Sequence, residues 1–188
     1  MSDAAEPGPV DWSPLHAQDA AEGSPDTPAF PTGTPVAASV AIGAAVVATA
    51  AVGTYVQTRS SKSWYDGLRK PPGQPPSWLF GPVWTVLYAG IAWNGIRLWR
   101  TLDSSRRQRA RALWVAQLAT NAAWTPLFFG LRRPGLALID QVALDAFTVA
   151  LRREVGTVDP TTTKVLDAYL AWLAYATYLN AGVVLRNR

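Results

Sequence analysis

Long apolar stretches, separated by short basic or proline-rich connectors, make up the chain from residue 36 onward. The first stretch, 36–56, has 21 residues without a charge, enough to cross a hydrocarbon core of about 30 Å at about 1.5 Å per helical residue. Four further stretches of similar length follow at 80–99, 111–129, 134–151 and 165–185. The pattern therefore predicts an all-α fold, an integral membrane bundle of five transmembrane helices formed by residues 36–188.

A soluble, alanine-rich helical bundle is the alternative, because the last four stretches contain polar residues and the mean hydropathy of the whole chain is only +0.05. Asp140 and Asp145 are five residues apart, which is about 140° around a helix. They cannot both use the same interior face. Because a charge at the centre of a bilayer costs about 2.5–3.5 kcal/mol on insertion scales, we expect such groups to face the bundle or to reach an interface.

Residues 1–35 differ from the rest. They hold seven of the fifteen prolines and six acidic residues, with no Lys or Arg. Such a segment buries too little apolar surface to offset the entropy lost on ordering, so we predict a disordered tail. It has neither the basic start of a secretory signal nor the arginines of a mitochondrial transit peptide.

The amino-acid composition excludes several kinds of catalytic and metal site. The chain has no Cys, and its single His, His16, lies in the tail. Cysteine or histidine metal sites, Ser-His-Asp triads and histidine acid–base pairs are therefore excluded, and we predict no metal site and no catalytic residue. Whether the chain is an enzyme is left open at this stage, but the sequence offers no acid–base apparatus for one.

All 17 cations follow the tail, in connectors between apolar runs rather than along one helix face. This distribution is typical of membrane proteins and argues against nucleic-acid binding. With five spans, nine cations fall on one side of the membrane and eight on the other. The orientation in the membrane is therefore left open.

The connector before the second span contains Pro71, Pro72, Pro75 and Pro76. Each proline fixes φ and restrains the residue before it, so we predict a stiff, extended segment. Flanking Trp and Tyr residues fit either anchors at the lipid headgroups or an aromatic lid over the mouth of the bundle. We expect Pro82 in the first turn of the second span, where its missing N–H is harmless.

Two spans sort into distinct faces. In the third, Trp114, Asn121 and Phe128 share one side. The opposite side is a stripe of small residues that lets helices approach closely, and we predict that it forms a homodimer interface: Ala112, Ala116, Ala119 and Ala123. In the fifth span, one face carries Tyr169, Trp172, Ala176, Asn180 and Val183. Packing and ligand contact both remain open for these aromatic residues.

Three strings, in 64–88, 121–140 and 168–180, resemble the translocator protein family, also called tryptophan-rich sensory proteins or peripheral benzodiazepine receptors. The resemblance implies five transmembrane helices, commonly dimeric, around a pocket for porphyrins such as protoporphyrin IX or haem, with no cofactor required. It also implies which residues of this chain bind the ligand: Tyr65, Trp84, Asn121, Trp124, Trp172 and Ala176. The sequence departs from the family pattern at Ala168, where a proline is usual.

The resemblance implies a membrane-embedded protein that binds and senses tetrapyrroles, with membrane lipid as its surroundings. A transporter of porphyrins or lipids, and a porphyrin-degrading enzyme that uses light or oxygen, are the alternatives. The expected location is a bacterial cell membrane, or the mitochondrial outer membrane or another organelle membrane in a eukaryote. Tyr178 lies eight residues before Arg186, too far for the cholesterol-recognition pattern, so we predict no cholesterol binding.

The alanine stripe yields a test. Replacing Ala116 and Ala119 with Leu should shift the detergent-corrected mass from that of two chains toward that of one, 20.2 kDa, because larger side chains keep helix backbones apart. Light scattering of the purified protein measures this mass. A dimer that survives the double substitution would place the interface on another helix.

Overall fold

The computed structural model describes residues 36–60, 62–101, 104–156 and 159–188. The predicted disordered tail, 1–35, lies outside these ranges. The described residues belong to one unit, 33–188. They contain helices and connectors but no strand, which confirms the predicted all-α fold class.

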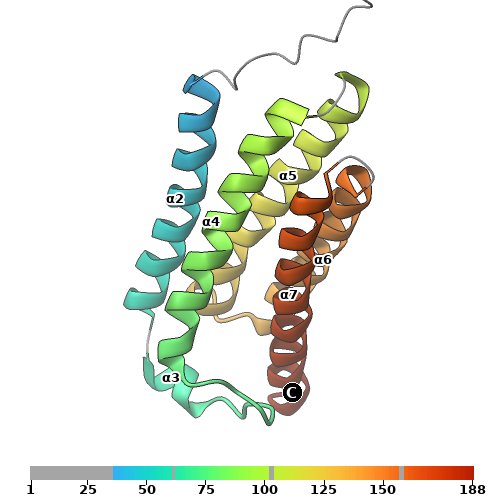
Figure 1. Ribbon diagram of the computed structural model, residues 1–188. Helices are drawn as coiled ribbons and strands as arrows, with labels where there is room; N and C mark the ends of the chain where they lie inside the picture. The colour runs from blue at the N-terminus through green and yellow to red at the C-terminus, as the bar shows by residue number, and fades with distance from the viewer. Residues whose placement is uncertain (1–35, 61, 102–103, 157–158) are drawn as a thin grey trace, which may run out of the picture. The chain divides into compact units, whose positions relative to one another are not determined.

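Five long helices form the bundle (Figure 1). They are α2 (Val36–Arg59), α4 (Ser77–Thr101), α5 (Ser104–Thr125), α6 (Pro134–Val155) and α7 (Pro160–Arg186). α2, α4, α6 and α7 each contain one predicted span, whereas the third predicted span, 111–129, begins inside α5 and ends beyond it. Two short elements were not predicted: α3 (Lys62–Gly67), and a π-helical turn, η1 (Pro126–Gly130).

Prolines set several of these boundaries. Pro134 and Pro160 occupy the first helical positions of α6 and α7, where the missing N–H costs nothing. Pro126 starts the π-helical turn that continues α5. The prediction for Pro82 was wrong. Because α4 begins at Ser77, Pro82 lies in its second turn and removes one backbone hydrogen bond of the helix.

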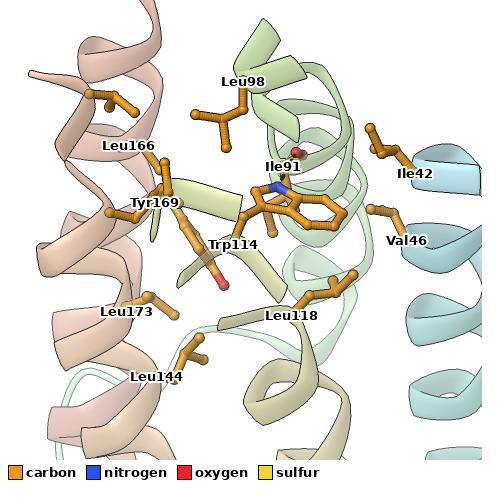
Figure 2. Packing of buried hydrophobic residues seen from close by; sticks show 13 residues of the cluster. Ile42, Val46, Ile91, Leu98, Trp114, Leu118, Leu144, Leu166, Tyr169 and Leu173 are labelled. Atoms are coloured by element: carbon orange, nitrogen blue, oxygen red, sulfur yellow. Dashed lines mark hydrogen bonds between the residues drawn. The ribbon is translucent and has the colours of Figure 1, made fainter. Parts of the chain in front are cut away.

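α5 packs along α6, and α6 packs along α7, while α2 packs against both α4 and α5. The core on one side of α5 is centred on Trp114, which is 3% exposed. Its indole Nε1 donates a hydrogen bond to the backbone oxygen of Ile91 at 3.1 Å. Figure 2 shows this ring between Ile91 of α4 and Ile42 and Val46 of α2. The indole thus fastens α2 and α4 to α5.

The outer surface of the bundle is apolar. Exposed large side chains include Val36 and Val40 on α2, Val86 on α4 and Ile139 on α6. By length and composition, three described helices can cross a membrane: α2, α6 and α7. α4 and α5 carry more polar residues, and they turn several of these toward the interior, where Asn94, Gln117 and Asn121 are buried: 1%, 2% and 6% exposed. Polar side chains of membrane-spanning helices are expected on such interior faces, because exposing them to hydrocarbon is costly.

The two aspartates of α6 have different surroundings, as their angular separation requires. Asp145 accepts hydrogen bonds from Gln141 Nε2 at 3.1 Å and from Thr177 Oγ1 of α7 at 2.7 Å. Asp140 is half-buried, and its Oδ2 has no partner among the described residues. Asp145 therefore links α6 to α7 through its hydrogen bonds, which offset part of the cost of placing a carboxylate inside a span.

The turn between α6 and α7 is fixed by Asp159, the N-cap residue of α7. Its carboxylate accepts hydrogen bonds from the backbone N–H groups of Thr161 and Thr162, and from Arg97 Nε of α4 at 2.6 Å. Burial raises the pKa of Asp159, but the bonds from Arg97 and Thr162 outweigh it, so the pKa is lowered from its ordinary value of 3.8. The resulting stabilisation is fully present above that value and is lost as the pH falls through the lowered pKa.

At the opposite end, the proline-rich connector runs along the C-terminal half of α7 (Figure 1). Tyr175 and Tyr178 donate their hydroxyl hydrogens to the backbone oxygens of Gly73 at 2.5 Å and Pro72 at 3.0 Å. Pro71 is buried against Gly182, where an added Cβ would lie 2.6 Å from the ring carbons of the proline. The connector is therefore tied to α7. It is non-helical, as the prolines predicted, but it turns at Pro72 and Gly73 rather than staying extended.

This close approach predicts the effect of adding one methyl group. Gly182→Ala should destabilise the protein by about 1–3 kcal/mol, because neither the proline ring nor the helix can yield cheaply. Gly43→Ala is the matched control, since no atom lies within 4 Å of a Cβ built there. Thermal unfolding in detergent should show a lower midpoint for Gly182→Ala only. Equal midpoints would mean that the connector moves away without cost.

Candidate functional site

Asn121, on α5, joins three helices at the centre of the bundle. Its Oδ1 accepts a hydrogen bond from the hydroxyl of Tyr88 on α4 at 3.0 Å. Its Nδ2 donates to the hydroxyl of Tyr169 on α7 at 2.9 Å. Asn121 is 6% exposed and Tyr169 is 2% exposed, so the hydrogen bond between them is shielded from the surroundings. The three hydrogen-bonded side chains are called the relay below. In Figure 2 the ring of Tyr169 projects from α7 into the bundle.

Trp84 lies one turn before Tyr88 on α4. The two ring centroids are 5.3 Å apart with an interplanar angle of 36°. Trp84 is therefore connected to Asn121 through Tyr88, and the two predicted ligand residues belong to one cluster. An aromatic pair of this kind contributes about 0.5–1.5 kcal/mol beyond the area that it buries.

Trp172, on α7, contacts one aromatic ring at the start of α4 and another about one turn further along α7. Its ring lies edge-on to Phe80, with centroids 6.0 Å apart, and 5.7 Å from the ring of Tyr175. Its indole Nε1 is buried and has no hydrogen-bond acceptor among the described residues. Leaving a buried donor without a partner costs about 1–3 kcal/mol, so such a group calls for an explanation.

Tyr65 and Trp124 belong to a second cluster, built around Phe128 in the π-helical turn. Trp124 stacks on Phe128 with centroids 4.9 Å apart and an angle of 20°. Tyr65 meets Phe128 edge-on at 6.3 Å. The hydroxyl of Tyr65 accepts a hydrogen bond from Gln74 Nε2 of the connector at 2.8 Å. The cluster therefore connects α5, the π-helical turn and the connector.

The predicted face of α7 is confirmed and links the two clusters. Asn180 accepts a hydrogen bond from Trp124 Nε1 at 3.1 Å and donates one to the backbone oxygen of Pro134 at 2.9 Å. Tyr169 and Asn180 thus hold α7 to α5 at two levels. Trp172 and Ala176, both half-buried, lie between these levels on the same face. Of the six predicted ligand residues, Trp84 and Asn121 thus belong to one cluster and Tyr65 and Trp124 to the other, with Trp172 and Ala176 on the face of α7 that links them.

The side chains of this region that were not predicted as site residues include Tyr88, Phe129 and Gln74. Tyr88 could have been found from its spacing of four from Trp84, which places both on one helical face. Phe129 and Gln74 follow from no periodic signal, because a π-helical turn and a proline-rich connector position them.

An apolar crevice of about 230 Å³ lies between α4 and α7. Its walls include Leu87, Gly90, Val165 and Tyr169. None of the six predicted ligand residues lines it, but Tyr169 separates it from Asn121. The crevice is smaller than the roughly 300–1,000 Å³ of most sites for drug-sized ligands.

The two faces predicted for the third span are also found. Trp114, Asn121 and Phe128 are all buried. On the opposite side, Ala112 and Ala119 are exposed, whereas Ala116 and Ala123 are half-buried. The alanine stripe therefore lies on the outside of the bundle. Its role as a homodimer interface stays a prediction.

Comparison with known proteins identifies the chain. The model of the TspO/MBR family matches residues 41–186, most of the chain. The chain belongs to the TspO/MBR family. It is 39% identical over 119 residues to the translocator protein of Homo sapiens, which spans 62% of this chain and 70% of that relative.

Similarity extends to microbial members of the TspO/MBR family. The tryptophan-rich protein TspO of Archaeoglobus fulgidus is 37% identical over 136 residues, 71% of this chain and 86% of the relative. The tryptophan-rich sensory protein of Cereibacter sphaeroides is 36% identical over 117 residues, 62% of this chain and 72% of the relative. The chain is therefore a membrane-embedded protein of the translocator and sensory type.

The relay through Asn121 gives a test of what holds this TspO/MBR site together. Asn121→Leu should lower the free energy of unfolding by about 1–3 kcal/mol, because the hydroxyls of Tyr88 and Tyr169 lose their partner while buried. Thermal or denaturant unfolding in detergent measures the loss.

A triple variant is the matched control. Adding Tyr88→Phe and Tyr169→Phe to Asn121→Leu removes all three polar partners together, and stability should largely return, since replacing both sides of a hydrogen bond with apolar groups can be nearly neutral. If the single and triple variants are equally unstable, packing rather than hydrogen bonding determines the contribution of Asn121.

Proposed function

We propose that the chain binds tetrapyrroles, such as protoporphyrin IX or haem, between α4, α5 and α7, and acts as a membrane-embedded sensor of them. The observation that carries this proposal is the unpartnered, buried indole N–H of Trp172 among aromatic rings. A ligand that offers a flat apolar face and a hydrogen-bond acceptor would satisfy both features.

Binding must separate existing contacts. The candidate residues now pack on one another or on neighbouring rings: Trp84 on Tyr88, and Trp124 on Phe128. Each such pair contributes only about 0.5–1.5 kcal/mol, so the larger face of a macrocycle can replace it. The connector, tied to α7 by tyrosine hydroxyls, is the segment whose displacement would open the region.

Axial ligation of haem iron has little support in this chain. Iron normally takes a His, Cys, Met or Tyr ligand, and here the chain has no Cys and its one His and one Met lie in residues 1–35. Among the tyrosines, Tyr65 is the candidate for an axial ligand. Burial raises its pKa above the ordinary 10.0, opposed by the hydrogen bond from Gln74, so the phenolate needed for ligation is disfavoured. The residues of this chain therefore fit a macrocycle that is held by stacking on tryptophan better than one that is held by coordination of its iron.

The stacking model predicts that metal-free protoporphyrin IX binds within a few-fold of haem, and that His16→Ala changes neither affinity. Trp84→Ala and Trp172→Ala should each weaken binding by about 0.5–3 kcal/mol. Quenching of tryptophan fluorescence during titration gives the dissociation constants. Haem that binds a hundredfold more tightly than the free base, with a Soret shift typical of coordination, would contradict stacking.

Two variants sharpen the result. Trp172→Phe keeps a ring but removes the N–H donor, and should lose about 0.5–1.5 kcal/mol of binding free energy through that bond alone. Trp78→Ala, on the same helix as Trp84 but 71% exposed, should leave the affinity unchanged. Illumination of the complex tests the degradation alternative through loss of porphyrin absorbance, and uptake into proteoliposomes tests transport.

A further inference from the structure

The two ends of the bundle differ in how their cations are neutralised. Where α4 and α6 end and α5 and α7 begin, three arginines form ion pairs with carboxylates of neighbouring helices. The connector end gathers eight cations from the end of α2, α3 and the connector, the turn before α6 and the end of α7 (Figure 1). These segments contain one acid, Asp66, and form no ion pair among the described residues.

Two of these eight cations rest on the aromatic cluster of the candidate site. Lys70 Nζ lies 4.3 Å from the ring centroid of Tyr65. Arg132 Cζ lies 6.0 Å from the ring centroid of Trp64. Both rings meet Phe128, at 6.3 Å and 5.9 Å between centroids. The two charges therefore flank one cluster, which also contains Trp124 stacked on Phe128.

The backbone at Arg132 is strained. Its φ of 55° lies in the left-handed region, which glycine adopts freely and a residue with a side chain avoids. Hydrogen bonds on either side, from Leu131 N to Pro126 O and from Arg133 N to Leu127 O, hold this turn in place. The fold thus maintains an unfavourable conformation at the residue that places a guanidinium beside the cluster.

We propose that Lys70 and Arg132 form a cationic rim that binds the carboxylates of the ligand. The proposal rests on the tetrapyrrole function proposed above, and it narrows the ligand class to flat amphipathic molecules with acidic groups at one edge. A cation–π contact leaves the positive charge in place, so a carboxylate can still form a charge-assisted hydrogen bond with the same group.

The position of the rim favours the ligand, rather than a lipid headgroup, as the source of the anion that the rim binds. Lys70 is half-buried, and its ring partner Tyr65 belongs to the candidate site. Arg59 provides the contrast. It lies 4.6 Å over Tyr55, a ring on α2 that is 57% exposed and outside both clusters, as expected for a cation at the lipid headgroups.

The experiment compares protoporphyrin IX with its dimethyl ester, which keeps the macrocycle but lacks the carboxylates. The full chain is placed in nanodiscs of phosphatidylcholine, and partition of each compound into empty nanodiscs is subtracted. The free acid should bind about tenfold more tightly than the ester. The double variant Lys70→Gln, Arg132→Gln should reduce that ratio to about threefold or less by weakening the free acid alone.

Arg59→Gln is the matched control, because it removes the same charge from the same end and should leave the ratio unchanged. A second measurement guards against a double variant that does not fold. On the unchanged protein, raising the salt concentration to about 0.5 M should weaken the free acid several-fold and the ester little, since salt screens exposed charges.

The possible results separate failure of the rim from failure of the proposed function. Equal binding of acid and ester would overturn the rim while leaving the tetrapyrrole site standing, and so would an equal effect of Arg59→Gln. A tenfold loss of free-acid affinity when phosphatidylglycerol is added would assign the rim to lipid headgroups and overturn the proposal. If neither compound binds, the proposed function fails, and the rim fails with it.

Discussion

Inside a hydrocarbon layer there is no water to satisfy a polar group, so a buried group without a partner in the protein is costly. This constraint is met most economically at Asn121, where one amide on α5 bonds tyrosines from α4 and α7. The backbone of α7 lies along α6 rather than along α5, so these side chains set the spacing of the central region. The same constraint makes the bare N–H of Trp172 informative, because nothing in the described chain satisfies it.

Aromatic rings fill the space that the hydrogen bonds define. Around Phe128 they join the π-helical turn, the short helix α3 and the end of α5 into one cluster. The connector packs against α7. Tyrosines of α7 donate hydrogen bonds to its carbonyl groups, and Pro71 contacts Gly182. Ring contacts thus hold the aromatic cluster together, and hydrogen bonds from tyrosines hold the connector against α7.

The distribution of charge gives the two ends of the bundle different roles. At one end, ion pairs such as Arg97 with Asp159 stabilise the turn between α6 and α7. At the other, two cations lie against rings of the aromatic cluster without carboxylate partners among the described residues. A charge that is already paired stabilises the fold, whereas an unpaired one can still recognise a ligand. This difference supports the connector end as the side of the site at which an acidic ligand would be recognised.

Hydrophobic periodicity and length determined the fold class and the approximate extent of all five long helices, because a span must match the thickness of the bilayer. Helical angles alone also placed Asn121 and Tyr169 on interior faces, since 100° per residue fixes which side chains share a side. The local sequence could not determine the start of α4 before Pro82, the short helix α3 or the π-helical turn, because these depend on packing between segments. Only the tertiary structure decided which groups meet: Tyr88 bonds Asn121, and Lys70 and Arg132 lie over the rings of Tyr65 and Trp64. It also decided that the indole N–H of Trp172 has no partner among the described residues. These contacts join residues as far apart in the sequence as Trp64 and Arg132, over which no periodic pattern specifies distance.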